Sequence, residues 1–581
     1  MPFRFLVHLV LALAIAGPTL VAYNVSPSAT LLNQLLSLAG WGLVLAAVPV
    51  PGLSPTAHEQ PLWLALVVLF VAIGWAQQEG LSSPLAWSAL ALLAAGAAVA
   101  WHGLNAATRR DGALVRAFHQ AMLLAGLASV VVALLQVLAP TAADGSFIAH
   151  SGLPGRAVGN LRQPNHLSSL LMWALVEWVP LAQASQLARQ REKVLALGIA
   201  GLLMWAVVLT ASRTGIVGVV LLALWGLVDK RLARWVRIAL VSAPVAYALI
   251  ALAMSGWAHT TGHTFGGEGR LAEGDVSASR FGIWANTIEM IRQQPWTGVG
   301  FGEFNFAWTL TPFPGRPVAF FDHTHNLPLQ LWVELGIPLG SLVLGLLLWA
   351  LVQAGVRSWR VPGEEGAGSR AAFMMVLMIG VHSLFEYPLW YAYFLLPTAW
   401  AWGYALRLPE AAKPKHELPA PRFGAPLLLR LAGVLMIVGS LYALYDYWKV
   451  VAIYAPTDDA GPLPERIERG QGSLFFSHHA DYAAATTTTP PSAAMAAFGT
   501  TTHSLLDTRL MLAWAQALAE SGNRDKASYL AARLREFRNP ASAEFFEVCN
   551  DPDKMAASPP PFQCVPPPAG LTWRDFQAHT E

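Results

Sequence analysis

The sequence predicts an all-α polytopic membrane protein with about 13 transmembrane helices (12–14), a large loop on one side and a mostly helical C-terminal domain. Of 581 residues, 55% are hydrophobic and 12% are charged, whereas soluble domains carry about 25% charged residues. Apolar runs long enough to cross a bilayer recur from the N-terminus to about residue 448. The 23 Trp residues suit anchoring at both membrane interfaces, and a net charge of +2 gives no basic surface for nucleic acid.

Thirteen apolar runs mark the expected spans. They lie at about 3–23, 31–50, 61–77, 84–102, 116–138, 165–183, 194–211, 213–228, 236–255, 326–354, 371–386, 388–406 and 425–448. The first run has the charge pattern of a secretory signal but no small-residue cleavage site, so we interpret it as a retained helix. The short runs that meet at Arg213 and at Pro388 fit either full spans or re-entrant helices.

The distribution of basic residues predicts the orientation. If the N-terminus is cytoplasmic, the cytoplasmic loops hold nineteen Arg and Lys residues, and the opposite loops of the membrane part hold seven. The positive-inside rule therefore favours a cytoplasmic N-terminus and a C-terminus on the other side. Because arginines on that outer side oppose the rule, we expect anionic partners for them. They are Arg156, Arg162, Arg213, Arg270, Arg280, Arg292 and Arg316.

The spans divide the chain into a transmembrane domain, 1–448, and an outer domain, 449–581. The transmembrane domain has two long outer loops, 139–164 and 256–325. We expect the second to contain a glycine-rich lid over 256–276 and an amphipathic helix near 278–294. In the outer domain, the segment near 508–537 is typical of a tetratricopeptide-like helical pair. The only two cysteines, Cys549 and Cys564, can pair in an oxidising compartment, and two free thiols are the alternative.

Two histidines precede one of the spans, in the sequence FFDHTHNLPLQLWVELG. An extended backbone would place His323 and His325 on one side. A zinc site needs three or four ligands, and the sequence has neither HExxH nor a cysteine cluster, so we predict no metal. Such a pair is often a packing feature, but a neutral imidazole also serves as a general base. Asp322 or Asn326 would then fix its tautomer.

Two outer arginines fit a phosphate site. Arg213 lies between two apolar runs in LTASRTGIVG, and Arg280 lies in SASRFGIWANTIEMIRQQPWTGVGFGEFN. Either side chain alone could simply extend to lipid headgroups. A guanidinium group also binds phosphate in a bidentate fork and keeps its charge, so the two together could neutralise a diphosphate without a metal.

The segment GRAVGNLRQPNHLSSLL contributes Arg156, Arg162, Gln163 and Asn165. The two amides could hydrogen-bond sugar hydroxyls or an acceptor. A structural alternative is a turn at Pro164 with Asn165 as a helix N-cap.

The segment HSLFEYPLWYAYFLLP contributes Glu386, Tyr387 and Tyr391 at a span junction interrupted by proline. Interfacial tyrosines are usually anchors, but an ionisable glutamate at a helix break indicates a functional site.

Together these stretches resemble the O-antigen ligase superfamily of bacterial membrane glycosyltransferases. SRTG, SRFGIWANTIEMIRQQPWTGVGFGEF and HTHNLPLQLWVELGIPLG are similar to the whole group. GRAVGNLRQPNHLSSLL, HSLFEYPLWYAYFLLP and the outer domain resemble its pilin-type protein O-oligosaccharyltransferases. The resemblance is strong from about residue 150 to 406 and looser from there to 581. Before residue 140, the chain is similar to the family only in its hydropathy.

The resemblance implies transfer of an oligosaccharide from undecaprenyl diphosphate to a Ser or Thr hydroxyl of a pilin or other periplasmic protein. It implies a bacterial inner-membrane enzyme that needs no cofactor and inverts the anomeric centre. His325 would be the general base with His323 beside it, and Arg213 and Arg280 would bind the diphosphate. The remaining candidates would position glycan or acceptor: Arg156, Arg162, Gln163, Asn165, Asp322, Asn326, Glu386, Tyr387 and Tyr391.

Four other functions remain open at this stage. A lipid A core O-antigen ligase or an O-antigen polymerase would use the same groups with a different acceptor. A polysaccharide-lipid transporter would place its polar groups near the bilayer midplane and show repeat symmetry, whereas these clusters lie at one interface. A structural scaffold would leave the arginines and histidines unexplained.

Overall fold

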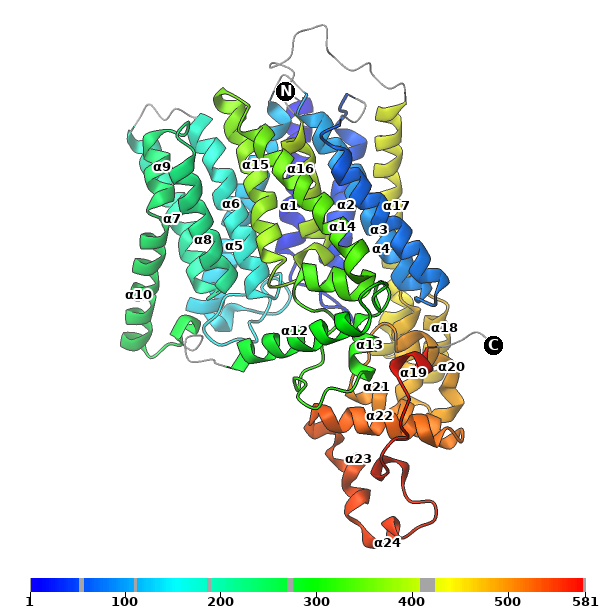
Figure 1. Ribbon diagram of the computed structural model, residues 1–581. Helices are drawn as coiled ribbons and strands as arrows, with labels where there is room; N and C mark the ends of the chain where they lie inside the picture. Colours follow the sequence, from blue (N-terminus) through cyan, green and yellow to red (C-terminus); the bar gives the residue numbers. More distant parts are fainter. Residues whose placement is uncertain are drawn as a thin grey trace.

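Every regular element in the described residues of the chain is a helix. The computed structural model describes residues 2–51, 57–108, 112–184, 190–268, 275–407 and 424–577. Long helices run side by side in one bundle, and a second helical region lies against one end of it (Figure 1). The predicted all-α class is therefore confirmed.

Each of the thirteen predicted runs coincides with one helix or one bent pair of helices. The bundle helices are α1 (Pro2–Leu20), α2 (Leu31–Ala47), α3 (Gln60–Gln78), α4 (Ser83–Ala106), α5 (Ala113–Leu138), α6 (Pro164–Ala184), α7 (Gln190–Leu209), α8 (Arg213–Val228), α9 (Arg234–Val241), α10 (Ala243–Thr261), α14 (Leu327–Ser358), α15 (Gly363–His382), α16 (Ala392–Leu406) and α17 (Ala425–Tyr454).

Length and composition suit membrane crossing for seven helices within the described ranges. These are α1, α3, α4, α5, α7, α14 and α17, and α9 with α10, bent by 49°, forms an eighth candidate. Helices α2, α8 and α15 are apolar but shorter. A multi-pass architecture is thus supported, while the number thirteen stays a prediction.

Several residues on which the sequence-based predictions rest lie outside the described residues. They are Arg109, Arg110, Arg189, Arg270, Lys413, Lys415 and Arg422 from the orientation count, and 269–274 of the expected lid.

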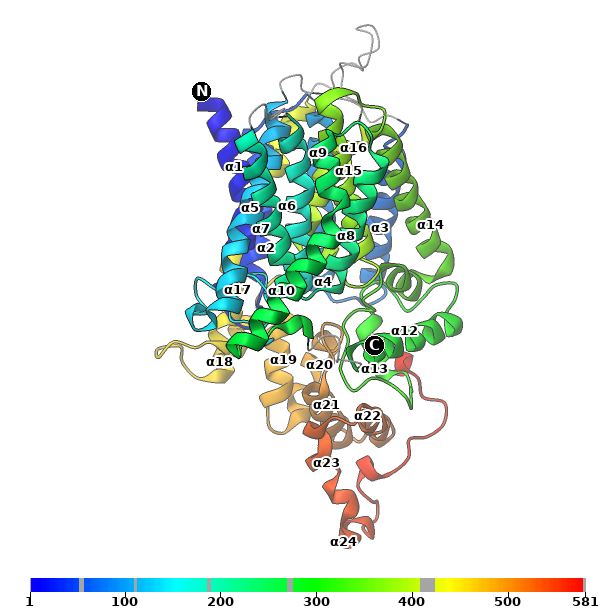
Figure 2. The ribbon, with the colours of Figure 1, turned by 90° about the vertical axis from the view of Figure 1, so that its left-hand side faces the viewer.

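The long loop between α10 and α14 forms helices of its own. α12 (Asp275–Gln293) covers the segment where an amphipathic helix was expected, and it lies across the end of the bundle (Figures 1 and 2). The short α13 (Phe304–Leu310) follows, and every one of its seven side chains is buried.

The C-terminal region shares a core with this loop. Its main helices are α18 (Leu463–Gln471), α19 (Ser477–Thr487), α20 (Met495–Thr501), α21 (Thr508–Glu520) and α22 (Arg524–Phe537). Phe306 and Trp308 of α13 pack with Leu510 and Leu530 of that region in one buried apolar cluster. The hydroxyl of Tyr529 donates to the carbonyl of Leu310 at 2.7 Å. A disulfide joins Cys549 to Cys564 beyond α22.

Helix α14 is broken after its first two turns, and the loop before α13 repairs the break. Gly336 has φ 76° and ψ 165°. The amides of Val299 and Gly300 donate to the carbonyls of Val333 and Glu334 at 2.8 and 3.0 Å. The break thus lets the first segment of α14 carry its N-terminus to the end of the bundle, with its free carbonyls satisfied.

Replacing Gly336 by alanine is expected to destabilise the protein by about 2 kcal/mol or more, because an L-residue is disfavoured at this positive φ. A Cβ there would also lie 2.3 Å from the carbonyl oxygen of Trp296. Thermal unfolding in detergent measures the effect. Gly345→Ala is the matched control on the same helix, because no atom lies within 4 Å of its added Cβ. Equal melting temperatures for the two variants would contradict this account.

Candidate active site

The candidate residues gather where three helices begin and α15 ends. α6 begins at Pro164, α8 is capped by Ser212, and α14 is capped by Asn326, whose side chain accepts from the amide of Leu329 at 3.0 Å. Helix N-termini carry partial positive charge, so this end of the bundle favours anions.

Glu386 is the centre of the cluster. It lies in the connection between α15 and α16, and its side chain is only 3% exposed. One carboxylate oxygen, Oε1, accepts from Asn165 Nδ2 at 2.9 Å and from Arg280 Nη2. The other, Oε2, accepts from His325 Nδ1 at 2.7 Å. One buried carboxylate therefore joins α6, α12 and the start of α14.

The neighbours of Glu386 keep it ionised. Burial alone would raise the pKa of this carboxyl, because the charged form loses its hydration. The hydrogen bond from His325 and the positive charge of Arg280 outweigh burial and lower the pKa of Glu386 to about 2. Glu386 thus acts as a fixed negative charge and hydrogen-bond acceptor.

The hydrogen bond between His325 Nδ1 and Glu386 defines the tautomer of His325. An ionised carboxylate only accepts hydrogen bonds, so Nδ1 carries the proton toward Glu386. In the neutral ring, Nε2 is then the basic nitrogen, the arrangement a general base requires. The expectation that Asp322 or Asn326 would fix the tautomer was wrong, because Asn326 caps α14 and Asp322 lies 3.1 Å from His323 Nδ1.

The backbone around the two histidines is not extended, as the sequence had suggested, because His325 has φ 53°, in the left-handed region. Both rings nevertheless contact Tyr387. His323 stacks on it with ring centroids 4.4 Å apart, and His325 meets the same tyrosine edge-on at 4.9 Å. A non-glycine residue held at positive φ is typical of functional sites.

The two arginines proposed for a diphosphate come from different helices that meet near Glu386. Arg280, on α12, pairs directly with Glu386. Arg213 is the first residue of α8 and has an exposed side chain. The hydroxyl of Ser212, its neighbour, donates to Asn165 Oδ1 at 2.7 Å. The chain of contacts therefore runs from the start of α8 through Asn165 to Glu386.

Asn165 links helices and does not cap one. α6 begins one residue earlier, at Pro164, so Asn165 already lies inside the helix, and the N-cap interpretation was wrong. Its amide nitrogen donates to Glu386 and its amide oxygen accepts from Ser212. The sequence missed Ser212 because a serine before a helix is ordinarily only a cap, a role it also has here through the amide of Gly215.

An aromatic wall adjoins the cluster. Tyr387 and Tyr391 lie with ring centroids 6.0 Å apart, and Trp390 meets His323 edge-on at 4.8 Å. Tyr391 also contacts the buried His166 of α6 at 4.6 Å. Stacked aromatic rings beside a histidine offer flat surfaces on which a sugar ring can lie.

Two of the predicted arginines are used for structure. Arg156 Nε donates to the carbonyl of Thr210 at 3.1 Å, and Arg162 donates to the carbonyls of Ala22 and Ala29. The acceptors in these contacts are neutral carbonyls. Anionic partners, as expected for outer arginines, are present for Arg280, for Arg292 with Glu289, and for Arg316 with Glu536.

Gln163 immediately precedes α6. Its buried Oε1 has no hydrogen-bond partner among the described residues. Within the same described ranges, no group of three or more His, Cys, Asp or Glu side chains could hold a metal ion.

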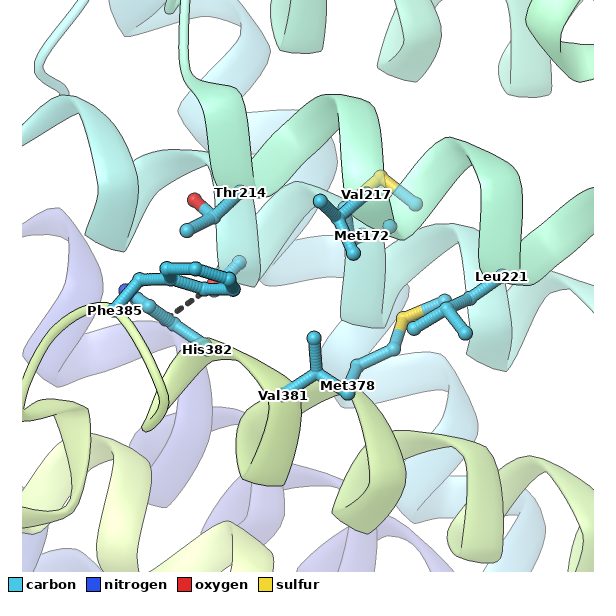
Figure 3. A pocket seen from close by; sticks show the side chains of 10 residues that line it. Met172, Thr214, Val217, Leu221, Met378, Val381, His382 and Phe385 are labelled. Carbon is cyan, nitrogen blue, oxygen red and sulfur yellow. Dashed lines mark hydrogen bonds between the residues drawn. The ribbon is translucent and has the colours of Figure 1, made fainter. Parts of the chain in front are cut away.

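A narrow cavity of ≈ 20 Å³ lies between α6, α8 and α15. Thr214, His382 and Phe385 lie at one end, and Leu221 and Met378 lie at the other (Figure 3). Ser169 and His382 Nδ1 are 2.7 Å apart at the polar end. The hydroxyl of Thr214 also lies 2.7 Å from the hydroxyl of Ser212, so the polar end of this cavity lies beside the contacts that run from Ser212 through Asn165 to Glu386.

Three family models match the chain. The O-antigen ligase model matches residues 198–344, the model described as virulence factor membrane-bound polymerase, C-terminal, matches 370–545, and the protein glycosylation ligase model matches 157–176.

Two curated proteins of Acinetobacter baylyi are similar to it. A general O-oligosaccharyltransferase is 25% identical over 303 residues, which are 51% of this chain and 50% of the relative. A ComP-specific O-oligosaccharyltransferase is 27% identical over 271 residues, 44% of this chain and 45% of the relative. The chain thus spans about half the length of the curated relatives it matches.

The residues that meet at Glu386 all lie within the matched segments. Asn165 lies in the glycosylation ligase match, Arg280 and His325 lie in the O-antigen ligase match, and Glu386 lies in the polymerase match. The resemblance to the O-antigen ligase group and its protein O-oligosaccharyltransferases, which the motifs indicated, is therefore confirmed.

Proposed function

We propose that this protein transfers an oligosaccharide from undecaprenyl diphosphate to a Ser or Thr hydroxyl of a pilin or other periplasmic protein. The observation that carries the proposal is the pairing of His325 and Arg280 with the same buried carboxylate, Glu386. That arrangement places a base beside a cation. Both similar proteins from Acinetobacter are named O-oligosaccharyltransferases, and a protein glycosylation ligase model matches residues 157–176, the end of the loop before α6 and the first part of that helix, which supports a protein acceptor.

In this mechanism His325 Nε2 accepts the proton of the acceptor hydroxyl. The hydroxyl oxygen attacks the anomeric carbon while the bond from that carbon to the diphosphate oxygen breaks. The electron pair of this bond leaves with the diphosphate, whose growing negative charge would be met by Arg280, Arg213 and the helix N-termini. A direct displacement of this kind inverts the anomeric centre.

We propose further that the site faces the periplasm from the inner membrane, with the N-terminus cytoplasmic. The positive-inside count supports this orientation. In this arrangement 1–448 is the transmembrane glycosyltransferase domain, with loops 139–164 and 256–325 outside. Residues 449–581 form the periplasmic domain, with the tetratricopeptide-like pair near 508–537.

The roles of the remaining candidates follow from their places. Glu386 and Asn165 hold His325 and Arg280, so they position the reacting groups. Tyr387, Tyr391 and His323 form the wall on which the glycan would stack. Gln163 is the best placed of the other polar groups for a sugar hydroxyl, because its Oε1 is unpartnered among the described residues.

A second candidate function is polymerisation of lipid-linked glycans. The polymerase model that matches residues 370–545 favours it, since that match includes Glu386 and the aromatic wall. The chemistry would be the same, with a sugar hydroxyl of a second lipid-linked glycan as the acceptor.

Reconstitution in liposomes distinguishes the functions. The full-length protein is supplied with an undecaprenyl-diphosphate oligosaccharide and, separately, with a pilin-type protein, lipid A core or donor lipid alone. We expect glycan on Ser or Thr of the protein, released by alkaline β-elimination and detected by mass spectrometry. Glycan only on lipid A core, or only as longer lipid-linked chains, would contradict a protein acceptor.

A further inference from the structure

A second cavity, of ≈ 750 Å³, lies between α3 and α14. None of its lining residues belongs to the Glu386 cluster. Val67, Val71 and Trp75 of α3 form one wall, and Leu335 and Leu339 of α14 form the other. The three α3 residues follow one another at intervals of four, so they make one apolar stripe along the helix.

The length of this cavity matches one leaflet of a bilayer. From Val67 to Glu79 the lining follows twelve residues of α3 and its C-cap, about 18 Å at 1.5 Å per residue. Half of a bilayer hydrocarbon core is about 15 Å thick. Trp75 and Trp296 also line the cavity and are 64% and 77% exposed, as expected for aromatic residues at a membrane interface.

The polar end of the cavity offers one charge of each sign. Arg574, in the short C-terminal helix η9 (Trp573–Phe576), donates from Nη2 to Gln294 Oε1 at 2.8 Å and lies over the ring of Trp573. The exposed Glu79 is its acidic counterpart. Glu334, the other acidic residue in the lining, is buried and accepts from Gln330 at 2.8 Å.

We propose that this cavity binds one zwitterionic phospholipid of the phosphatidylethanolamine type. An acyl chain would lie against Val67, Val71 and Leu339, the phosphate would meet Arg574, and the ammonium group would meet Glu79. Because Arg574 and Trp573 belong to the C-terminal segment, the lipid would hold that segment against α3. This inference is independent of the proposed reaction.

Native mass spectrometry of the full-length protein, purified in mild detergent, tests the proposal. We expect one phosphatidylethanolamine retained per wild-type chain. Val71→Trp fills the cavity and is expected to lower the retained fraction at least tenfold. Leu435→Trp on α17 is the matched control, because that side chain is equally directed outward, 70% exposed against 66% for Val71. Equal retention in wild type and Val71→Trp would overturn the proposal.

The headgroup contacts are tested by adding phosphatidylethanolamine or phosphatidylglycerol to delipidated protein. Arg574→Gln should weaken binding of both lipids by roughly tenfold, since both carry the phosphate. Glu79→Gln should reduce the preference for phosphatidylethanolamine and leave phosphatidylglycerol binding unchanged. A wild-type preference for phosphatidylglycerol would overturn the proposal, as would recovery of a polyprenyl diphosphate or an apolar peptide from the cavity.

Discussion

Replacing His325 by glutamine is expected to lower glycan transfer by roughly 10²–10⁴-fold, the usual contribution of a general base. The reason is that Nε2 of this ring is the basic nitrogen once Nδ1 is committed to Glu386. The measurement is initial transfer rate in liposomes at saturating donor and acceptor, with melting temperature as the check on folding.

Two companion variants separate chemistry from conformation. His325→Asn suits the left-handed backbone at φ 53°, because asparagine tolerates that region well, so it removes the base with less strain. His323→Gln is the matched neighbour, and it loses the ring contacts with Tyr387 and Trp390 and the pairing with Asp322. We expect both His325 variants to be slow and His323→Gln to keep most of the activity. The opposite order would identify His323 as the base.

Replacing Glu386 by glutamine is expected to cost a similar factor, roughly 10²–10⁴ in rate. The carboxylate accepts from Asn165, Arg280 and His325, and an amide has one accepting oxygen and a donating nitrogen. The amide nitrogen must therefore face a donor, or force His325 into the tautomer with Nδ1 unprotonated. The transfer rate measures the loss of the correct tautomer of His325, and the melting temperature measures the loss of stability when the amide nitrogen faces a donor.

A double variant shows whether the pair acts as a unit. If Glu386 works through His325, His325→Gln/Glu386→Gln should be little slower than either single variant, because residues that act together are strongly non-additive. Glu289→Gln on α12 is the control carboxylate, since Glu289 is 47% exposed, pairs with Arg292 and accepts from Gln293 on its own helix. If the rate loss of the double variant equals the product of the two single rate losses, the two residues act independently.

The helices of the bundle could be predicted from sequence because hydropathy alone determines them. Each predicted run coincides with a helix, since a backbone in lipid must satisfy its own hydrogen bonds. The break in α14 could not be placed in the same way. It depends on a positive φ at Gly336 and on amides of Val299 and Gly300, which lie more than thirty residues earlier in the chain.

The members of the candidate site could be named from their motifs, but their partners could not. His325, Arg280 and Glu386 were each singled out, yet the sequence assigned the tautomer of His325 to its immediate neighbours. The true partner lies 61 residues further along. Arg156 and Arg162 show the converse, because an outer arginine that donates to carbonyls has the same sequence signature as one awaiting phosphate.

The core shared by α13 and the C-terminal region sets an order of assembly. A nascent chain that has reached Tyr454 already contains Asn165, Arg280, His325 and Glu386, together with every bundle helix. It still lacks Leu510, Leu530 and Tyr529, against which α13 packs. The segment between α12 and α14 therefore gains its full support only after the C-terminal region has been synthesised, so this part of the structure is the last to form in biosynthesis.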